Sequence, residues 1–262
     1  MTVMIKDEIF PLHVEEEVRG RLFLGVLNYK PELNCQVSDA IEHAHWSLHI
    51  NHKWLVTRAF HVGSSDICDS RNVIVTQFYR QPQFTHALLV DGDVAWEPGA
   101  VARMLSHNVD LVLGAYPKRG DNEGFPIKFL DEVTPRTVNP RTGEYNADGL
   151  IKIKGGPTGF MLFKRTVIDR MVEAWPDAWY HHPKAIGGKA LDLFNFVVRD
   201  NKRSSEDMNF CRMWRDLGGD VWCDPHLTLR HIGDKTWAGK FVDELALLAP
   251  RNTTEKIIKI PA

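Results

Sequence analysis

The sequence predicts an α/β protein: a central mixed β-sheet flanked by helices, with a small antiparallel β element in the second half of the chain. Two observations lead to this class. Apolar runs alternate with helix-like segments over roughly the first 115 residues, which is the pattern of a doubly wound sheet. Residues 125–153 are instead rich in Pro, Gly, Asn and β-forming residues, which indicates a meander or hairpin.

In the first half, each element has a local signal. The run at residues 21–29, RLFLGVLNY, is apolar throughout, as is typical of a central strand buried on both faces. Polar capping residues open a helix at residues 66–78, and a proline lies in the first turn of a helix at residues 98–107. We also expect strands at residues 54–62, 85–90 and 110–115, and a helix at residues 38–50.

In the second half, a glycine-rich loop at residues 155–159, GGPTG, leads into the strand FMLF. A helix is predicted at residues 167–174. Residues 175–189 show no hydrophobic periodicity and are predicted to be irregular. Ser204 or Ser205 can cap a helix through MNFCRMWRDLG, which the pair Gly218-Gly219 ends. Strands at residues 221–223 and 227–231 close the predicted order, with Trp214 expected in the core.

Composition limits the classes of function. The chain has 262 residues, a formal net charge of -2, 44% hydrophobic and 25% charged residues, as in an ordinary globular protein. This charge gives no support for general attraction to nucleic acid or membranes, although local basic patches are compatible with it. The four cysteines form no CxxC pair and are predicted to be buried thiols in a reducing compartment.

No signal peptide or membrane segment is visible in the sequence. The N-terminal residues lack a basic region followed by a sustained apolar run, and no stretch approaches about 20 apolar residues. We therefore expect a cytoplasmic protein, or one separated from a natural anchor.

The first candidate for chemistry is Asp91-Gly92-Asp93, directly after the apolar strand THALLV. Ligands of open α/β sheets lie beyond the carboxyl ends of the strands, and two carboxylates there can ligate Mg²⁺ or Mn²⁺. An Asp-Gly turn without any such function is the simpler alternative. His231, in LTLRHIG, becomes a metal-ligand candidate only if the fold returns it to the Asp91/Asp93 turn.

The second candidate is Ser205-Glu206-Asp207, at the predicted start of a helix. Acidic residues in a first helical turn interact favourably with the helix dipole and cap the helix, which is a purely structural explanation. The functional alternative is that one carboxylate faces a cleft and acts as a general base on an acceptor hydroxyl.

Taken together and in this order, DGD, GGPTG, SED and LRHIG resemble the motifs of GT-A glycosyltransferases. The stretches SDICDSRN, THALLVDGDVAW and SSEDMNFCRMWRDLGGDVWCDPHLTLRHIG look close to the family-2-like branch, and the resemblance spans about residues 21–237. It implies a GT-A-type, Rossmann-like fold in a single domain over residues 1–262. Within it, about 21–115 would be the nucleotide-binding half, about 116–237 the acceptor and metal-completing half, and 238–262 a C-terminal tail.

The resemblance also implies roles for individual residues. Asp91, Asp93 and His231 would hold Mn²⁺ or Mg²⁺, and Asp207 or Glu206 would be the catalytic base. The implied donor-binding residues are Asn28, Asp66, Arg71, Asn72, Asp91, Lys118, Gly156 and Lys235.

Simpler explanations remain open for several of these donor-binding residues. Arg71 could form a helix-surface ion pair with Asp66 or Asp69, the two acidic residues just before it in the sequence. Lys118 could be a solvated loop charge, and Lys235 could belong to a lid.

The function implied is metal-dependent transfer of a sugar from a nucleotide diphosphate, with a UDP-sugar as the expected donor and inversion as the expected outcome. The acceptor could be a glycan, a lipid-linked sugar, a protein side chain or a hydroxylated pyrimidine in DNA, the last as for phage-type enzymes. Residues 175–189, with Trp179, are predicted to form an acceptor-side loop that orders on binding.

Two other functions stay open. One is a nucleotidyltransferase, although LNYKPELN lacks the basic, glycine-rich phosphate loop usual after the first strand. The other is a non-catalytic protein that binds sugar nucleotides. The sequence leaves the oligomeric state open.

Overall fold

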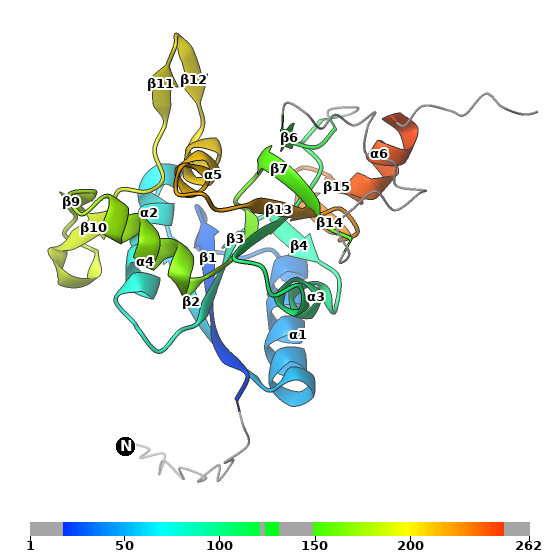
Figure 1. The fold of residues 1–262 in the computed structure, drawn as a ribbon. Coiled ribbons are helices and arrows are strands. Elements are labelled where there is room, and N and C mark those ends of the chain that lie inside the picture. Colours follow the sequence, from blue (N-terminus) through cyan, green and yellow to red (C-terminus); the bar gives the residue numbers. More distant parts are fainter. Residues whose placement is uncertain (1–17, 121–123, 131–148, 249–262) are drawn as a thin grey trace, which may run out of the picture.

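The computed structural model describes residues 18–120, 124–130 and 149–248 (Figure 1). Its centre is one eight-stranded sheet with the strand order β2-β1-β3-β8-β5-β13-β7-β6. Strands β1, β2 and β3 are mutually parallel, β8 runs antiparallel between β3 and β5, and β13 lies parallel to β5 and antiparallel to β7. The bounds are β1 (Gly20–Asn28), β2 (Trp54–Val62), β3 (His86–Asp91), β5 (Leu111–Gly114), β6 (Lys128–Phe129), β7 (Ile151–Gly155), β8 (Phe160–Lys164) and β13 (Val221–Asp224).

Strand β1 shows why this sheet is buried on both faces. Its side chains alternate between two apolar clusters, with Phe23 and Leu27 in one cluster and Leu22, Leu24 and Val26 in the other. Successive side chains of a strand point to opposite faces, so a run that is apolar throughout needs cover on both sides.

Helices supply that cover (Figure 1). On one face lie α1 (Cys35–His52) and α3 (Ala100–Ser106), whose buried residues belong to the cluster of Leu22. On the other face lie α2 (Ile67–Tyr79), α4 (Arg165–Ala174), α5 (Glu206–Asp216) and α6 (Phe241–Leu248), which pack into the cluster of Phe23. The predicted class, a central mixed sheet flanked by helices with small antiparallel elements, is therefore confirmed.

Small antiparallel sheets complete the fold. Strands β4 (Val94–Trp96), β14 (Leu229–Ile232) and β15 (Thr236–Gly239) form one of them, in the order β15-β14-β4. Strands β11 (Val197–Arg199) and β12 (Lys202–Ser204) form a hairpin that the sequence analysis missed. The meander predicted at residues 125–153 is represented by the antiparallel pair β6–β7, and residues 131–148 lie outside the described residues.

The prediction that residues 175–189 are irregular was wrong. Strand β9 (Trp179–His181) pairs antiparallel with β10 (Lys189–Leu191), and a short 3₁₀ helix (Ile186–Gly188) joins them. The Trp179 ring lies 5.9 Å from the Tyr79 ring and has the Arg80 guanidinium 5.2 Å from its centroid. These contacts attach the segment to α2, so Trp179 acts as a packing anchor; an acceptor role for it stays a prediction.

Three smaller expectations can be compared with the structure. Within the expected tail, Phe241 and Leu245 of α6 are buried in the core. Trp214 is fully buried, as predicted. Among the cysteines, which are all free, Cys211 and Cys223 are buried as expected, but Cys35 is exposed, which corrects that prediction.

No helix in the described parts of the chain is long and apolar enough to cross a bilayer. The predicted division at about residue 115 stays a prediction, although strands from both sides of it share the central sheet.

Candidate active site

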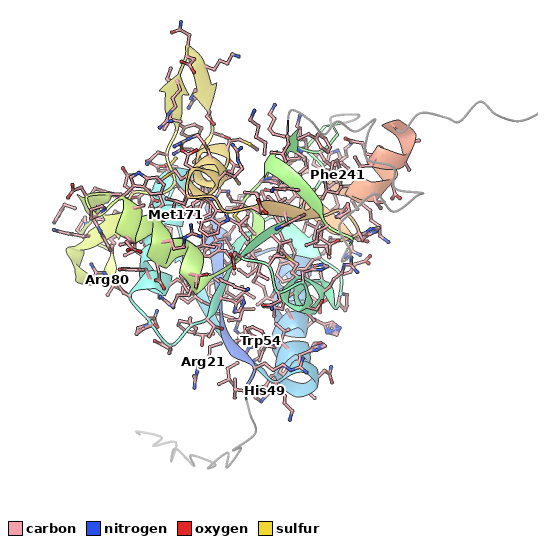
Figure 2. The ribbon with its side chains drawn as sticks, in the orientation of Figure 1. Arg21, His49, Trp54, Arg80, Met171 and Phe241 are labelled. Carbon is pink, nitrogen blue, oxygen red and sulfur yellow. The ribbon has the colours of Figure 1, made fainter. Side chains whose placement is uncertain are left out.

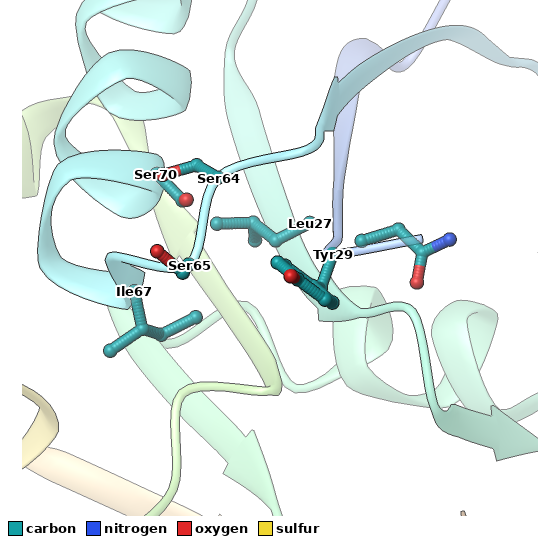
Figure 3. Close-up of a pocket in the computed structure, with 7 residues that line it drawn as sticks. Leu27, Tyr29, Ser64, Ser65, Ile67 and Ser70 are labelled. Carbon is teal, nitrogen blue, oxygen red and sulfur yellow. The ribbon is translucent and has the colours of Figure 1, made fainter. Parts of the chain in front are cut away.

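A cavity of about 520 Å³ opens at the carboxyl ends of β1 and β3. The residues around it include Asn28, Tyr29, Asp91, Asp93, Arg119 and Ile232. A second cavity of about 330 Å³ shares Leu27, Asn28, Tyr29 and Ile67 with the first and adds Ser64, Ser65 and Ser70 (Figure 3). The two cavities therefore adjoin each other between the end of β1 and the start of α2, where open α/β sheets bind ligands.

His231 reaches this site through pairing between β4 and β14. The register places His231 opposite Val94, and the Ile232 N–H donates a 2.8 Å hydrogen bond to the Asp93 carbonyl. The His231 Nε2 atom lies 3.8 Å from Asp93 Oδ2. The fold thus returns His231 to the Asp91/Asp93 turn, the condition that its candidacy as a ligand required.

The tautomer of His231 suits a metal ligand. Nδ1 lies 2.9 Å from the Pro117 carbonyl oxygen, which only accepts, so Nδ1 carries the proton. Nε2 lies on the side of Asp93 and is the ring nitrogen that a metal ion would bind. A metal-binding histidine has this arrangement, in which one ring nitrogen donates to a carbonyl and the other binds the ion.

Arg119 is a competitor for the same carboxylate. Its guanidinium forms an ion pair with Asp93 and donates a 2.7 Å hydrogen bond to the Ile232 carbonyl. Within the described residues, no three His, Cys, Asp or Glu side chains converge closely enough to hold a metal ion. The donor types of Asp93 and His231 nevertheless suit Mn²⁺ or Mg²⁺, so the residues fit a cation once Arg119 leaves Asp93.

Arg71 links the strand-end acid to the helix-start acid. Its guanidinium is 3% exposed, donates to both oxygens of Asp91 at 3.1 Å, and forms an ion pair with Glu206. Burial lowers the pKa of Arg71. The charges of Asp91, Asp207 and Glu206 together raise this pKa by more than burial lowers it, so the net shift is upward. The alternative of a surface ion pair with Asp66 or Asp69 is wrong, because Arg71 points into the molecule.

Asp91 sits in crowded acidic surroundings. Burial raises the pKa of Asp91, the Arg71 guanidinium lowers it, and Asp93 raises it again, with a net upward shift. The Tyr116 hydroxyl lies 3.4 Å from Asp91 Oδ2 and donates to it. Tyr116 is a contact that the sequence analysis missed, since nothing local distinguishes it from an ordinary core tyrosine.

The two candidate bases are separated by their surroundings. Glu206 is buried and paired with Arg71; burial and then Asp207 raise the pKa of Glu206 against the effect of that arginine. Asp207 remains half-buried. Ser205 is the N-cap residue of α5 but makes no capping hydrogen bond through its side chain. Of the two acids, Asp207 is therefore the one with a carboxylate not committed to Arg71.

The glycine-rich loop makes room for the protein's own side chains. A Cβ atom on Gly159 would lie 2.4 Å from Asp91 Oδ2 and from the Tyr116 hydroxyl. A Cβ atom on Gly156 would lie 2.8 Å from Ile127 Cδ1, within the core. Gly159 thereby permits the position of the Asp91 carboxylate, whereas the donor contact predicted for Gly156 stays a prediction.

Of the predicted nucleotide-binding residues, Asn28 borders the cavities, whereas Asp66 has a structural contact. Asn28 borders both cavities, and its amide donates to the Lys30 and Glu32 carbonyls at 2.6 and 2.9 Å. Asp66 instead caps α2, accepting from the backbone N–H groups of Cys68 and Asp69 at 2.9 and 3.1 Å.

The other predicted donor-binding residues, Asn72, Lys118 and Lys235, do not border these two cavities. Asn72 is buried, and its amide oxygen accepts from the backbone N–H groups of Leu193 and Phe194. Lys118 and Lys235 border a different cavity of about 820 Å³. Their donor contacts, like those of Asp66 and Asn72, stay predictions.

A scan against protein-family models and a search of curated proteins found no match. Among solved structures, the chain is similar to A197 from STIV, with 12% identity, a TM-score of 0.50, and coverage of 84% of this chain and 90% of that one. It is also similar to a glycosyltransferase involved in the glycosylation of the major capsid of PBCV-1, at 12% identity and a TM-score of 0.31, over 60% of this chain and 66% of that one. A third similarity is to S. aureus TarS 1-349, at 13% identity and a TM-score of 0.36, over 82% of this chain and 59% of that one. At these identities, the similarity to A197 is one of fold alone.

Proposed function

We propose that this protein is a metal-dependent glycosyltransferase that moves a sugar from a nucleotide-diphosphate donor, a UDP-sugar, to an acceptor hydroxyl. The observation that carries the proposal is the arrival of His231 beside Asp93, at the cavity that also contains Asp91. Turn formation by Asp91-Gly92-Asp93 alone does not explain why a histidine from a distant strand lies beside Asp93.

The donor would lie along the two adjoining cavities. The nucleobase of the donor would occupy the smaller one, between Tyr29 and Ile67 and beside the hydroxyls of Ser64 and Ser65. The diphosphate would lie in the larger one, next to Arg119 and Asp93. Asp93 and His231, with Asp91 beside them, would hold Mn²⁺ or Mg²⁺, which when bound neutralises charge on the leaving diphosphate.

The chain's own base would be Asp207. The acceptor oxygen attacks the anomeric carbon, its proton passes to the Asp207 carboxylate, and the bond from that carbon to the diphosphate oxygen breaks with inversion. Glu206 would act as a positioning residue, because its ion pair with Arg71 joins the start of α5 to Asp91 at the end of β3.

Calorimetry with Mn²⁺ and a UDP-sugar tests the metal assignment. Asp93→Ala and His231→Ala should each weaken metal-dependent donor binding while the protein stays folded. His49→Ala, which removes an exposed histidine at the far end of α1, is the matched control (Figure 2). Donor affinity that is unchanged in both site variants would refute the metal assignment.

The separation of binding from chemistry is tested with Asp207→Asn. This variant should keep donor and metal binding but lose about 10²- to 10⁴-fold in transfer rate, the usual contribution of a general base. Near-native turnover would move the role to Glu206 or indicate a retaining mechanism.

The products distinguish the alternative functions. Release of a free nucleoside diphosphate indicates glycosyl transfer, and release of pyrophosphate indicates a nucleotidyltransferase. Donor binding without turnover indicates a non-catalytic protein.

A further inference from the structure

The hairpin of β11 and β12 stands out from the body of the molecule above α5 (Figure 1). Its two strands contact mainly each other. Asp200 and Asn201 join them with φ values of 50° and 59°, the backbone of a tight two-residue hairpin turn. An isolated two-stranded hairpin is only marginally stable in water, so this arm would gain stability from a partner that covers it.

One face of the arm carries two cations side by side. The register places Arg199 directly opposite Lys202, next to the turn, and both side chains are exposed. Like charges opposite each other on neighbouring strands destabilise a hairpin. Asp200 is the single acidic residue between Phe196 and Ser204, so the segment is net positive in a chain whose formal charge is -2. An anionic partner would remove the repulsion that the isolated arm suffers.

The other face combines an aromatic ring with a third cation. Arg203 lies opposite Val198, and its guanidinium is 4.2 Å from the centroid of the Phe196 ring. Phe196 is 46% exposed and Val198 is 71% exposed. Cations that track a phosphate backbone, together with an aromatic face on which bases can stack, are the combination used to bind nucleic acid strands.

Both ends of the arm are anchored at α5. Before β11, the Phe194 ring stacks on the Phe210 ring of α5, with centroids 4.3 Å apart and an interplanar angle of 6°. After β12, the chain continues directly into the first turn of α5, which contains Glu206 and Asp207. A polymer held on the arm would therefore lie beside the acceptor side of the site.

We infer that the β11–β12 hairpin is a nucleic-acid-binding arm for DNA and, resting on the proposed function, that the DNA it holds is the sugar acceptor. A neutral glycan would not relieve the repulsion between Arg199 and Lys202. A membrane partner is disfavoured by the polar tip, because Asp200 and Asn201 lie there while Phe196 lies at the base of the arm. A two-stranded ribbon also has dimensions that fit the major groove of a DNA duplex.

The test is fluorescence anisotropy with a short labelled DNA duplex and the corresponding single strand, titrated with the full chain. The arm variant is Arg199→Ala/Lys202→Ala/Arg203→Ala. The control, Arg21→Ala/Lys184→Ala/Lys189→Ala, removes the same charge from exposed positions elsewhere. We expect the arm variant to lose at least about tenfold in affinity at low salt, with a salt slope shallower by up to about 2.7, or 0.9 per phosphate contact. The control should bind almost like the unaltered protein.

Three outcomes overturn the inference: no DNA binding by the unaltered chain, equal losses in both variants, or arm-dependent binding to phosphatidylserine vesicles but not to DNA. Hydrolysis of a UDP-sugar, measured on the same samples, keeps the two proposals apart. Arm-dependent DNA binding without any donor hydrolysis would support the arm and refute the enzyme. Donor hydrolysis with arm-independent DNA binding would do the reverse.

Discussion

Two strands of the central sheet end in an aspartate, and the two aspartates have opposite surroundings. Asp224, at the end of β13, accepts from His107 Nε2 at 2.8 Å, from Arg103 Nε at 2.6 Å and from the His226 N–H at 3.0 Å. Burial alone would raise the pKa of Asp224, but these hydrogen bonds together bring it below its usual value. Asp91, at the end of β3, has a raised pKa.

The difference lies in the balance of charge. Around Asp224, donors outnumber acids, so its carboxylate is fully used in joining β13 to α3. Around Asp91, the single buried cation Arg71 is shared with Glu206 and faces Asp207, while Asp93 lies on the next turn. An excess of acidic groups around one cation is unfavourable for folding but favourable for binding a cation, which is typical of functional sites.

The largest effect should come from removing the shared cation. Arg71→Met leaves the buried Glu206 and the half-buried Asp91 without their cation and should lower the free energy of unfolding by about 3–5 kcal/mol in urea titrations. Adding Glu206→Gln should recover part of that loss. Arg103→Met is the matched variant at Asp224 and should cost clearly less, because His107 and the His226 N–H remain. Equal losses at both sites would mean that the surroundings of the two aspartates do not differ in this way.

Neutralising each aspartate should have unequal effects on stability. Asp224→Asn weakens the hydrogen bonds that Arg103 and His107 make to a buried carboxylate and should cost about 1–3 kcal/mol. Asp91→Asn relieves acid crowding and should change the free energy of unfolding by less than about 1 kcal/mol, while it weakens Mn²⁺ and donor binding. Urea unfolding and calorimetry on both variants check this, and a stable Asp224→Asn protein with impaired donor binding would contradict it.

The two variants should also depend on pH in opposite ways. Asp224 has a lowered folded pKa, so its stabilisation is present above about pH 4 and is lost as the pH falls through the folded value. Asp91 has a raised folded pKa, so its contribution is favourable below about pH 4 and is lost as the pH rises through the folded value. The loss in the free energy of unfolding caused by Asp224→Asn should therefore grow as the pH rises. The Asp91→Asn variant should instead become more stable relative to the unaltered protein as the pH rises. Parallel curves for the two variants in urea unfolding between about pH 3 and pH 7 would exclude this assignment.

The smallest effect concerns Arg119. Since it competes with a cation for Asp93 through an ion pair that is about half exposed, Arg119→Ala should strengthen binding of Mn²⁺ alone by up to about fivefold, or about 1 kcal/mol. Arg230→Ala removes a comparable exposed pair, with Glu97 at 3.4 Å on the same small sheet, and should leave Mn²⁺ affinity unchanged. Weaker Mn²⁺ binding in Arg119→Ala would mean that the arginine assists the cation.

The parallel half of the fold was predictable because its signals are local. Strand β2 has the predicted bounds, and Asp66 caps α2 as the polar residues before it indicated. The pair β9–β10 was not predictable from local periodicity. Its order depends on contacts with α2, such as the 2.7 Å hydrogen bond that the Tyr180 hydroxyl donates to Asp69.

At the candidate site, the position of Asp91 and Asp93 after an apolar strand was visible in the sequence, as was the acidic first turn of α5. The inward direction of Arg71 was not. The nearby Asp66 and Asp69 suggested a surface pair, but only the sheet order brings α2, β3 and α5 close enough for one buried arginine to bind both Asp91 and Glu206.

By itself, then, the sequence determined which strands end in carboxylates, where helices are capped and which strands are apolar on both faces. These features could be predicted because periodicity and capping act over a few residues. The tertiary structure decided which of these charges meet. It decided that His231 lies beside Asp93, that Asp224 is satisfied while Asp91 is crowded, and that a cationic hairpin emerges next to α5. These outcomes depend on strand order and cross-strand register between segments far apart in the chain, which local patterns do not encode.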